Sequence, residues 1–275
     1  MSAASGFAAT LDGRTVLHWE SAGDGEPVLL IMGLGLTSAA WWRTVPVLAQ
    51  RLRVITFDNR GVGRSSAFSH AYTTAAMADD AATVLDAVGV ERAHVYGFSL
   101  GGMVAQALAL RHPDRVRSLV LGATSPGGPR AVRPSPEVAA FFRRRPRMRP
   151  EEAARASVPI NYGPRCRAEH LDRIEQDVAR RLAQPFSERA YRAQLFAAAW
   201  HNCLGALHRI TAPTLVVHGA LDRIIPVANA HLIAERVPGA RLCVLAEAGH
   251  LYPTDEPGAD RAIARFLADR REEAA

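Results

Sequence analysis

The chain has 275 residues, of which 48% are hydrophobic and 22% charged, values that are ordinary for a globular protein near the size limit of one hydrophobic core. The formal net charge is +6 and every basic residue is an arginine, so chemistry that needs a lysine, such as a Schiff base or a phosphate-loop lysine, is excluded. No run of about 18 apolar residues occurs, so no membrane-spanning helix and no membrane partner are expected.

The first part of the chain alternates short apolar runs with stretches of helical periodicity. Short apolar runs between turn residues predict strands, and apolar residues three or four positions apart predict helices. We expect strands at 15–19, 28–31, 53–57, 94–96 and 116–121, and helices at 74–88 and 100–111. This alternation is typical of α/β proteins with a mostly parallel, twisted sheet flanked by helices.

The alternation stops at Thr124, where Ser125 to Pro129 is rich in glycine and proline and breaks regular structure. A stretch rich in proline and arginine follows, with helical periodicity at 168–182 and 188–207. The strand and helix pattern then resumes, with strands at 214–218 and 241–245 and helices at 227–237, after Pro226, and 257–270. The sequence therefore predicts a core formed by 1–123 and 211–275, with a helical cap inserted at 124–210.

The predicted cap carries the positive charge of the chain, because it contains 16 arginines and only eight acidic residues. Its densest run, Arg143 to Arg149, lacks the interleaved aromatic residues of a nucleic-acid-binding module, so no nucleic-acid partner is expected. Charge runs of this kind usually form solvated faces. A second interpretation is that a positive lid raises the local concentration of anionic substrates.

The segment Gly97-Phe98-Ser99-Leu100-Gly101 fits the pattern G-x-S-x-G. It follows a predicted strand and opens a predicted helix, which is the setting that this motif requires. Glycines suit the sharp turn that lifts a serine hydroxyl above the sheet. Ser99 is therefore the candidate nucleophile, and the alternative is a glycine-rich turn with a surface serine.

A serine hydroxyl is a poor nucleophile unless a neighbouring base removes its proton. His250 is the candidate base, because it follows the last predicted strand and is preceded by glycine. Asp222 follows the strand 214–218 and is the candidate acid that orients the histidine. The chain order serine, acid, histidine fits a strand–turn–helix nucleophile of this type. Asp255 and Glu247 are alternative acids, and Asp222 as a helix N-cap is a competing interpretation.

Acyl transfer also needs two backbone N–H donors that stabilise the oxyanion. The residue after the nucleophile, Leu100, supplies one of them. The second is expected in the loop after the strand 28–31, which has the sequence Met32-Gly33-Leu34-Gly35, and we assign it to Leu34.

Five segments in the same order resemble the α/β-hydrolase superfamily over nearly the whole chain, namely 29–33, 58–65, 97–102, 212–219 with Asp222, and 249–250. Residues 101–113 are similar to the small esterase, enol-lactonase and cofactor-free perhydrolase group. The chain departs from many members at Met32, where they carry a histidine. The resemblance implies that 58–65 is a structural turn whose Asp and Arg brace neighbouring loops.

The resemblance and the candidate residues together favour a serine hydrolase that cleaves a small carboxylic ester or lactone through an acyl-enzyme, with no metal or organic cofactor. A carbon–carbon bond hydrolase or a perhydrolase that uses the same three residues, Ser99, Asp222 and His250, is an alternative. A ligand-binding receptor of the same fold with little turnover is the alternative from another class. Dehalogenases and epoxide hydrolases are disfavoured, because those relatives carry aspartate in place of Ser99.

Two features bear on where the protein works. Met1 to Thr10 lacks a basic n-region and a true h-region, so no signal peptide is expected. The cysteines, Cys166, Cys203 and Cys243, match neither a disulfide framework nor a zinc site. We therefore expect free thiols and a cytoplasmic protein. The oligomeric state is left open, a homo-oligomer included.

Overall fold

The computed structural model describes residues 3–10, 13–66 and 72–268. These residues form an eight-stranded sheet with the strand order β1-β2-β4-β3-β5-β6-β7-β8. The pairs β1–β2 and β2–β4 are antiparallel, and the other pairs are parallel. The strands are β1 (Ala3–Ala9), β2 (Val16–Ala22), β3 (Glu26–Ile31), β4 (Leu52–Phe57), β5 (Ala93–Phe98), β6 (Val116–Gly122), β7 (Thr214–Gly219) and β8 (Arg241–Leu245). The predicted fold class, a mostly parallel sheet flanked by helices, is confirmed.

Helices cover both faces of the sheet, and each face has its own hydrophobic core. One core joins α2 (Thr74–Ala87), α3 (Leu100–Arg111) and α9 (Ala228–Arg236) to the sheet. The other joins α1 (Thr44–Leu48) and α11 (Gly258–Ala268). Successive residues of β3 alternate between the two cores, which explains why its sequence is a continuous apolar run.

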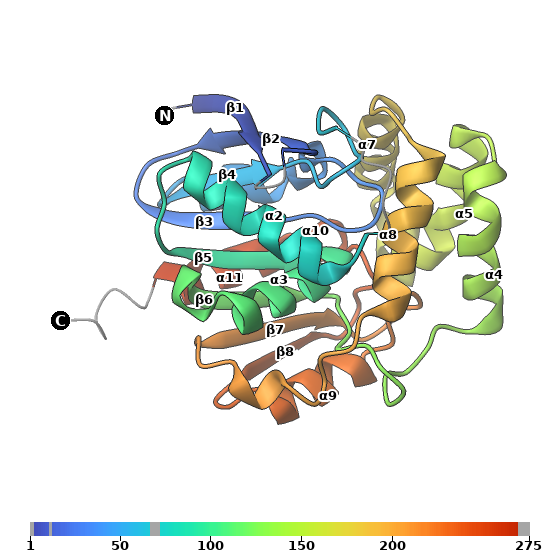
Figure 1. Ribbon diagram of the computed structural model, residues 1–275. Helices are drawn as coiled ribbons and strands as arrows, with labels where there is room; N and C mark the ends of the chain where they lie inside the picture. Colours follow the sequence, from blue (N-terminus) through green and yellow to red (C-terminus); the bar gives the residue numbers. More distant parts are fainter. Residues whose placement is uncertain (1–2, 11–12, 67–71, 269–275) are drawn as a thin grey trace.

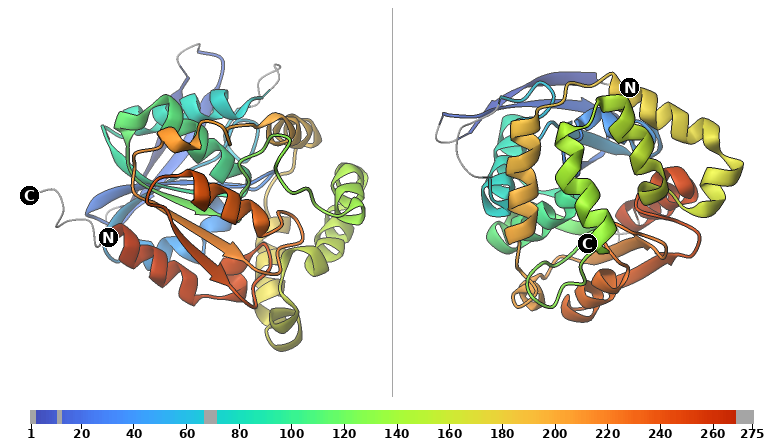
Figure 2. Two further views of the ribbon diagram at one scale, coloured as in Figure 1. Left: turned by 90° about the horizontal axis from the view of Figure 1, so that it is seen from below. Right: turned by 90° about the vertical axis from the view of Figure 1, so that its right-hand side faces the viewer.

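Five helices lie between β6 and β7 in the chain: α4 (Pro136–Arg144), α5 (Pro150–Asn161), α6 (Pro164–Glu169), α7 (Leu171–Leu182) and α8 (Glu188–Trp200). They gather at one end of the sheet (Figure 1), and the view onto that end shows them lying across it (Figure 2). We propose that residues 124–210 form a cap domain on a core made of 1–123 and 211–275.

Short elements complete the described chain. The helix α10 spans Tyr252–Asp255, and 3-10 turns span Ser38–Trp41, Pro113–Arg115, Arg145–Arg147 and Leu207–Arg209. No helix within the described ranges is both long enough and apolar enough to cross a membrane.

Two helices that the sequence predicts in the insertion have different bounds in the structure. The helix predicted at 168–182 is wrong as a single element, because His170 leaves the helical conformation (φ −135°, ψ 44°) and separates α6 from α7. The helix predicted at 188–207 ends at Trp200. His201 is extended there, since its carbonyl accepts a hydrogen bond from the N–H of Gly128 in the segment that enters the insertion.

Smaller differences lie near the chain ends. The strand β1 was not expected, because Ala3–Ala9 is dominated by small residues of low strand propensity, and its pairing with β2 forms it. The last helix is described to Ala268, and residues 269–270 of the predicted helix lie outside the described residues.

One buried carboxyl group gives the fold a pH-dependent stability. Asp260 on α11 is 2% exposed. Its Oδ2 accepts a hydrogen bond from the hydroxyl of Thr44 (2.9 Å), and its Oδ1 has no partner among the described residues. Burial raises the pKa of Asp260 to about 6, against the opposing effect of the Thr44 hydrogen bond. The folded state therefore holds this proton in a pH range where the unfolded state has lost it.

We expect Asp260→Asn to stabilise the protein more at neutral than at acidic pH. Because the pKa is raised in the folded state, stability falls as pH rises from the unfolded value towards the folded value of about 6. Asparagine does not ionise, so the variant does not lose stability in this way. Its free energy of unfolding relative to that of the wild type should therefore grow by about 1 kcal/mol between ~pH 5 and ~pH 7. Urea unfolding at both pH values measures the difference. A difference that does not change with pH would contradict the assignment.

Candidate active site

Ser99 lies at the turn between β5 and α3, in the left-handed region of backbone conformation (φ 56°, ψ −119°). The flanking glycines are required by close packing. A Cβ on Gly101 would overlap the carbonyl oxygen of Ile31, and a Cβ on Gly97 would lie 2.6 Å from the Cβ of Ala105. Only glycine fits at these positions, so the G-x-S-x-G pattern follows from the geometry of this turn.

The structure brings Ser99, His250 and Asp222 together. Nε2 of His250 lies 3.0 Å from Oγ of Ser99, and Nδ1 of His250 lies 2.7 Å from Oδ2 of Asp222. His250 is 5% exposed and Asp222 is 6% exposed, whereas Ser99 is only partly buried. The three side chains thus form one hydrogen-bonded line, with the serine hydroxyl at its more accessible end.

The environment of Asp222 favours its ionised form. Burial alone would raise the pKa of this carboxyl. The charge of His250 and hydrogen bonds from His218 and His250 outweigh burial and hold the pKa of Asp222 well below its usual value. Its Oδ1 also accepts the backbone N–H groups of Ile224 (2.8 Å) and Ile225 (2.9 Å). Asp222 therefore caps the following turn and contacts His250 at the same time.

The alternative acids do not lie against His250. Oδ2 of Asp255 accepts the backbone N–H groups of Gly163 (2.9 Å) and Gly249 (2.7 Å), and Glu247 is exposed. Asp255 thus fixes the backbone just before His250 and ties it to the insertion. His218, the second side chain against Asp222 (3.2 Å), was not singled out in the sequence, where it ends an ordinary strand pattern.

The loop after β3 lies directly beside Ser99. A Cβ on Gly33 would lie 3.6 Å from the Oγ of Ser99. Leu34 and Leu100 both line the same cavity, and neither backbone N–H has a hydrogen-bond partner among the described residues. Met32 is 5% exposed and packs in the core, while its carbonyl accepts a hydrogen bond from Asn59 (2.8 Å).

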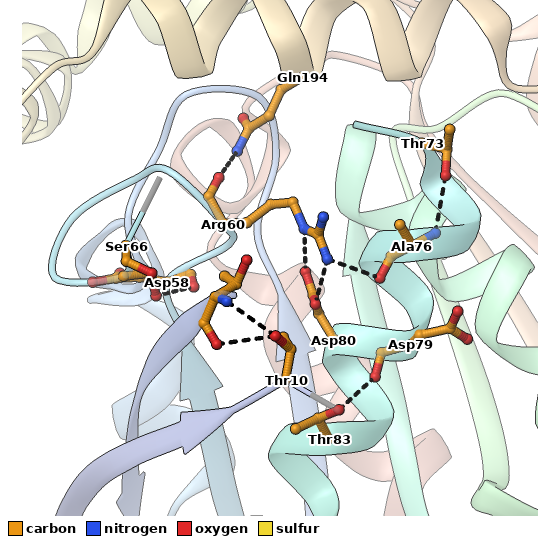
Figure 3. A network of polar contacts seen from close by, with 12 residues as sticks. Thr10, Asp58, Arg60, Ser66, Thr73, Ala76, Asp79, Asp80, Thr83 and Gln194 are labelled. Carbon is orange, nitrogen blue, oxygen red and sulfur yellow. Dashed lines mark hydrogen bonds and ion pairs between the residues drawn. The ribbon is translucent and has the colours of Figure 1, made fainter. Parts of the chain in front are cut away.

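Helix α8 of the insertion is tied to this loop through Gln194, which is fully buried. Its Oε1 accepts the N–H of Gly35 (2.9 Å), and its Nε2 donates to the carbonyl of Arg60 (3.2 Å). The guanidinium of Arg60 in turn forms an ion pair with Asp80 on α2 (2.6 Å), as Figure 3 shows. One amide side chain therefore links the insertion to the loop that carries Leu34 and to the turn at 58–65.

The turn at 58–65 also contacts the chain that follows the loop carrying Leu34. Asp58 accepts the backbone N–H of Ser38 at 2.7 Å and of Arg64 at 2.9 Å. Its own carbonyl accepts the hydroxyl of Ser65 at 2.6 Å. These contacts connect the end of strand β4 to Ser38, which lies beyond the loop that carries Leu34.

Two of the cysteines, Cys166 and Cys203, are poorly suited to act as nucleophiles. All three are free thiols. Burial raises the pKa of Cys166 and of Cys203 to about 12, so thiolate is scarce at neutral pH at both positions. Among the described residues, no group of three or more His, Cys, Asp or Glu side chains is arranged to hold a metal ion.

Ser99, His250, Leu34 and Leu100 all border a cavity of about 700 Å³ between the sheet and the insertion. Apolar side chains dominate its walls. A cavity of this size accommodates a small organic substrate. A nucleophile with a hydrogen-bonded base and nearby N–H donors is suited to acyl transfer.

Comparisons with known proteins identify relatives of this chain. The family described as "alpha/beta hydrolase fold" matches residues 26–257. The chain is similar to "Putative carbamate hydrolase RutD" of Variovorax paradoxus, with 36% identity over 92% of this chain and 96% of the relative. It is also similar to the pimeloyl-(acyl-carrier protein) methyl ester esterase of Aeromonas hydrophila, with 32% identity over 84% of this chain and 91% of the relative. Among solved structures, a hydrolase from Pseudomonas aeruginosa PA01 superposes with a TM-score of 0.83 at 32% identity, over 96% of this chain and 98% of that one.

Proposed function

The chain belongs to the alpha/beta hydrolase fold family, and on that premise we propose that it is a serine hydrolase that cleaves a small carboxylic ester or lactone. Ser99 is the proposed nucleophile, His250 the base and Asp222 the acid. The observation that carries this proposal is the unbroken line of contacts from the serine hydroxyl through the imidazole to a buried, ionised carboxylate.

The proposed reaction proceeds through an acyl-enzyme. His250 removes the proton from Oγ of Ser99 as the oxygen attacks the substrate carbonyl, and Asp222 stabilises the resulting imidazolium. The N–H groups of Leu34 and Leu100 then donate to the oxyanion of the tetrahedral intermediate. His250 returns the proton to the leaving oxygen, and a water activated by the same imidazole later releases the acyl group.

The names of two relatives support a proposal of ester hydrolysis. One relative is named a methyl ester esterase and another is named a carbamate hydrolase, and both names describe cleavage at an acyl or carbamoyl carbon. The same triad also fits carbon–carbon bond hydrolysis or perhydrolysis, and these remain alternatives on the same site. A receptor that binds its ligand with little turnover is the alternative from another class.

Turnover of simple esters tests the proposal. The purified protein should hydrolyse short p-nitrophenyl esters steadily over many turnovers, because Ser99 is partly exposed to a cavity large enough for them. A panel of lactones, a carbamate and a vinylogous diketone measured beside them separates the enzyme alternatives. Binding of these compounds without turnover would overturn the proposal and favour a receptor.

A further inference from the structure

The charges that line the cavity are strongly unequal. Asp177 is the one carboxylate among the described cavity residues, whereas six arginines border the same space: Arg43, Arg133, Arg143, Arg145, Arg180 and Arg181. A cavity with such an excess of guanidinium groups favours a bound anion.

Asp177 cannot neutralise all six arginines, because it carries a single negative charge and its oxygens already accept hydrogen bonds from other groups. Oδ1 accepts hydrogen bonds from the indole of Trp42 (3.1 Å) and from Nε of Arg43 (3.3 Å). Oδ2 accepts hydrogen bonds from the hydroxyls of Tyr162 (3.2 Å) and Thr254 (2.5 Å). The single carboxylate is therefore paired with Arg43 and held at one side of the cavity.

Arg145 is held in the cavity wall without an anionic partner. Its guanidinium lies over the rings of Phe186 (5.1 Å) and Tyr191 (4.7 Å). Its Nη1 is buried and has no hydrogen-bond partner among the described residues. The stacking fixes the direction of the guanidinium, and no described carboxylate forms an ion pair with it, so its positive charge is free to attract an anionic ligand in the cavity.

Arg181 on α7 is the second such group. Both terminal nitrogens donate to the hydroxyl of Ser157, at 3.3 Å for Nη1 and 3.2 Å for Nη2, and no described carboxylate lies within 4.0 Å. Burial, followed by the nearby charge of Arg145, lowers the pKa of Arg181 to about 10. The two guanidinium groups thus repel each other in a partly desolvated space, and an anion between them would relieve this repulsion.

Arg145 is also close to the loop beside the proposed nucleophile. A Cβ on Gly35 would lie 3.9 Å from Nη1 of Arg145, and one on Gly33 would lie 3.6 Å from Oγ of Ser99. The two glycines are separated by one residue, so their Cα atoms are at most about 7 Å apart. Ser99 and Arg145 also line the same cavity, so one molecule bound there can contact both.

We propose that Arg145 and Arg181 form a carboxylate-binding subsite, and that the substrate is an ester or lactone with a free carboxylate several bonds from the scissile carbonyl. This inference rests on the proposed function and adds the class of substrate to it. A guanidinium matches a carboxylate in charge and planar geometry. Exposed arginines can attract an anionic substrate from a distance, whereas the proposed subsite binds its carboxylate by direct contact inside the cavity.

Matched anionic and neutral esters test the subsite. One pair, the p-nitrophenyl monoester of adipic acid and p-nitrophenyl heptanoate, places the carboxylate on the acyl side. A second pair, 5-carboxypentyl butyrate and hexyl butyrate, places it on the alcohol side. The readout is the ratio of kcat/KM for the anionic ester to that for the neutral ester, because this ratio cancels a general loss of activity. The wild type should favour the anionic member of at least one pair by about tenfold or more.

Arg145→Gln should abolish most of this preference, and Arg181→Gln should reduce it. Arg144→Gln is the matched control, since Arg144 is the exposed neighbour and its replacement removes the same charge. This control should keep the preference. Thermal melts monitor folding, and Arg145→Met, which retains packing against Phe186 and Tyr191, replaces the glutamine variant if that variant does not fold.

Three outcomes separate the inference from the function on which it rests. If the wild type hydrolyses the neutral esters but prefers neither anionic ester, the subsite is wrong and the hydrolase proposal stands. If Arg144→Gln and added salt reduce the preference as much as Arg145→Gln does, the exposed charge steers the substrate and the subsite is wrong. If the wild type hydrolyses no ester at all, the proposed function itself fails.

Discussion

Replacing Ser99 by alanine is expected to lower kcat for ester hydrolysis by about three to six orders of magnitude. The hydroxyl of Ser99 lies 3.0 Å from Nε2 of His250, so the variant loses the proposed nucleophile and leaves the proposed base in place. Residual activity should come from the N–H donors and from substrate binding. Steady-state kinetics with a p-nitrophenyl ester measures the loss.

The fold should survive this change. Alanine keeps the Cβ that already fits at φ 56°, and the glycines around the turn are unchanged. A thermal melt of Ser99→Ala should therefore match the wild type closely. Ser125→Ala, which alters another serine of the same cavity, is the control and should keep most of the turnover. Nearly full activity in Ser99→Ala with an unchanged melt would show that another group is the nucleophile.

Asp222→Asn is expected to lower kcat by about four orders of magnitude. The amide has no charge to stabilise the imidazolium, and its NH₂ group opposes the N–H of His250 Nδ1 across the 2.7 Å contact. The imidazole then favours the tautomer that cannot accept the serine proton. The oxygen of the asparagine can still accept the N–H groups of Ile224 and Ile225, so the turn should remain folded.

Asp255→Asn is the matched comparison for this prediction. Asp255 carries the same group, lies near His250 in the chain and is buried, but its oxygen accepts two backbone N–H groups and does not contact the imidazole. Its replacement should therefore change kcat far less than Asp222→Asn does. A silent Asp222→Asn together with a large loss in Asp255→Asn would assign the acid to Asp255.

The sequence predicted the arrangement of the core because short-range patterns determine it. Apolar runs separated by helical periodicity imply parallel strands, and the loops that follow parallel strands meet at one edge of the sheet. Ser99, Asp222 and His250 each follow such a strand, so their neighbourhood could be inferred without knowing any distance. The same reasoning placed Leu34 and Leu100 beside them.

The insertion was harder to predict, because contacts far apart in the sequence determine its form. His201 ends α8 early by pairing with Gly128, and no local pattern indicates this. The run from Arg143 to Arg149 was expected to be a solvated face, which holds for the exposed Arg144. Arg145 instead turns into the cavity and stacks on Phe186 and Tyr191, two residues more than 40 positions away. Composition alone could not separate these two arginines.

Labelling with a fluorophosphonate tests the central claim most directly, because such probes react with an activated serine and need no knowledge of the substrate. The folded wild type should take up one probe, peptide mapping should locate it on Ser99, and Ser99→Ala should take up none. Labelling should also slow strongly in His250→Ala, since the imidazole 3.0 Å from Oγ is the proposed base that activates the hydroxyl. A folded wild type that stays unlabelled, or that carries the probe on another residue, would contradict the assignment of Ser99 as the nucleophile.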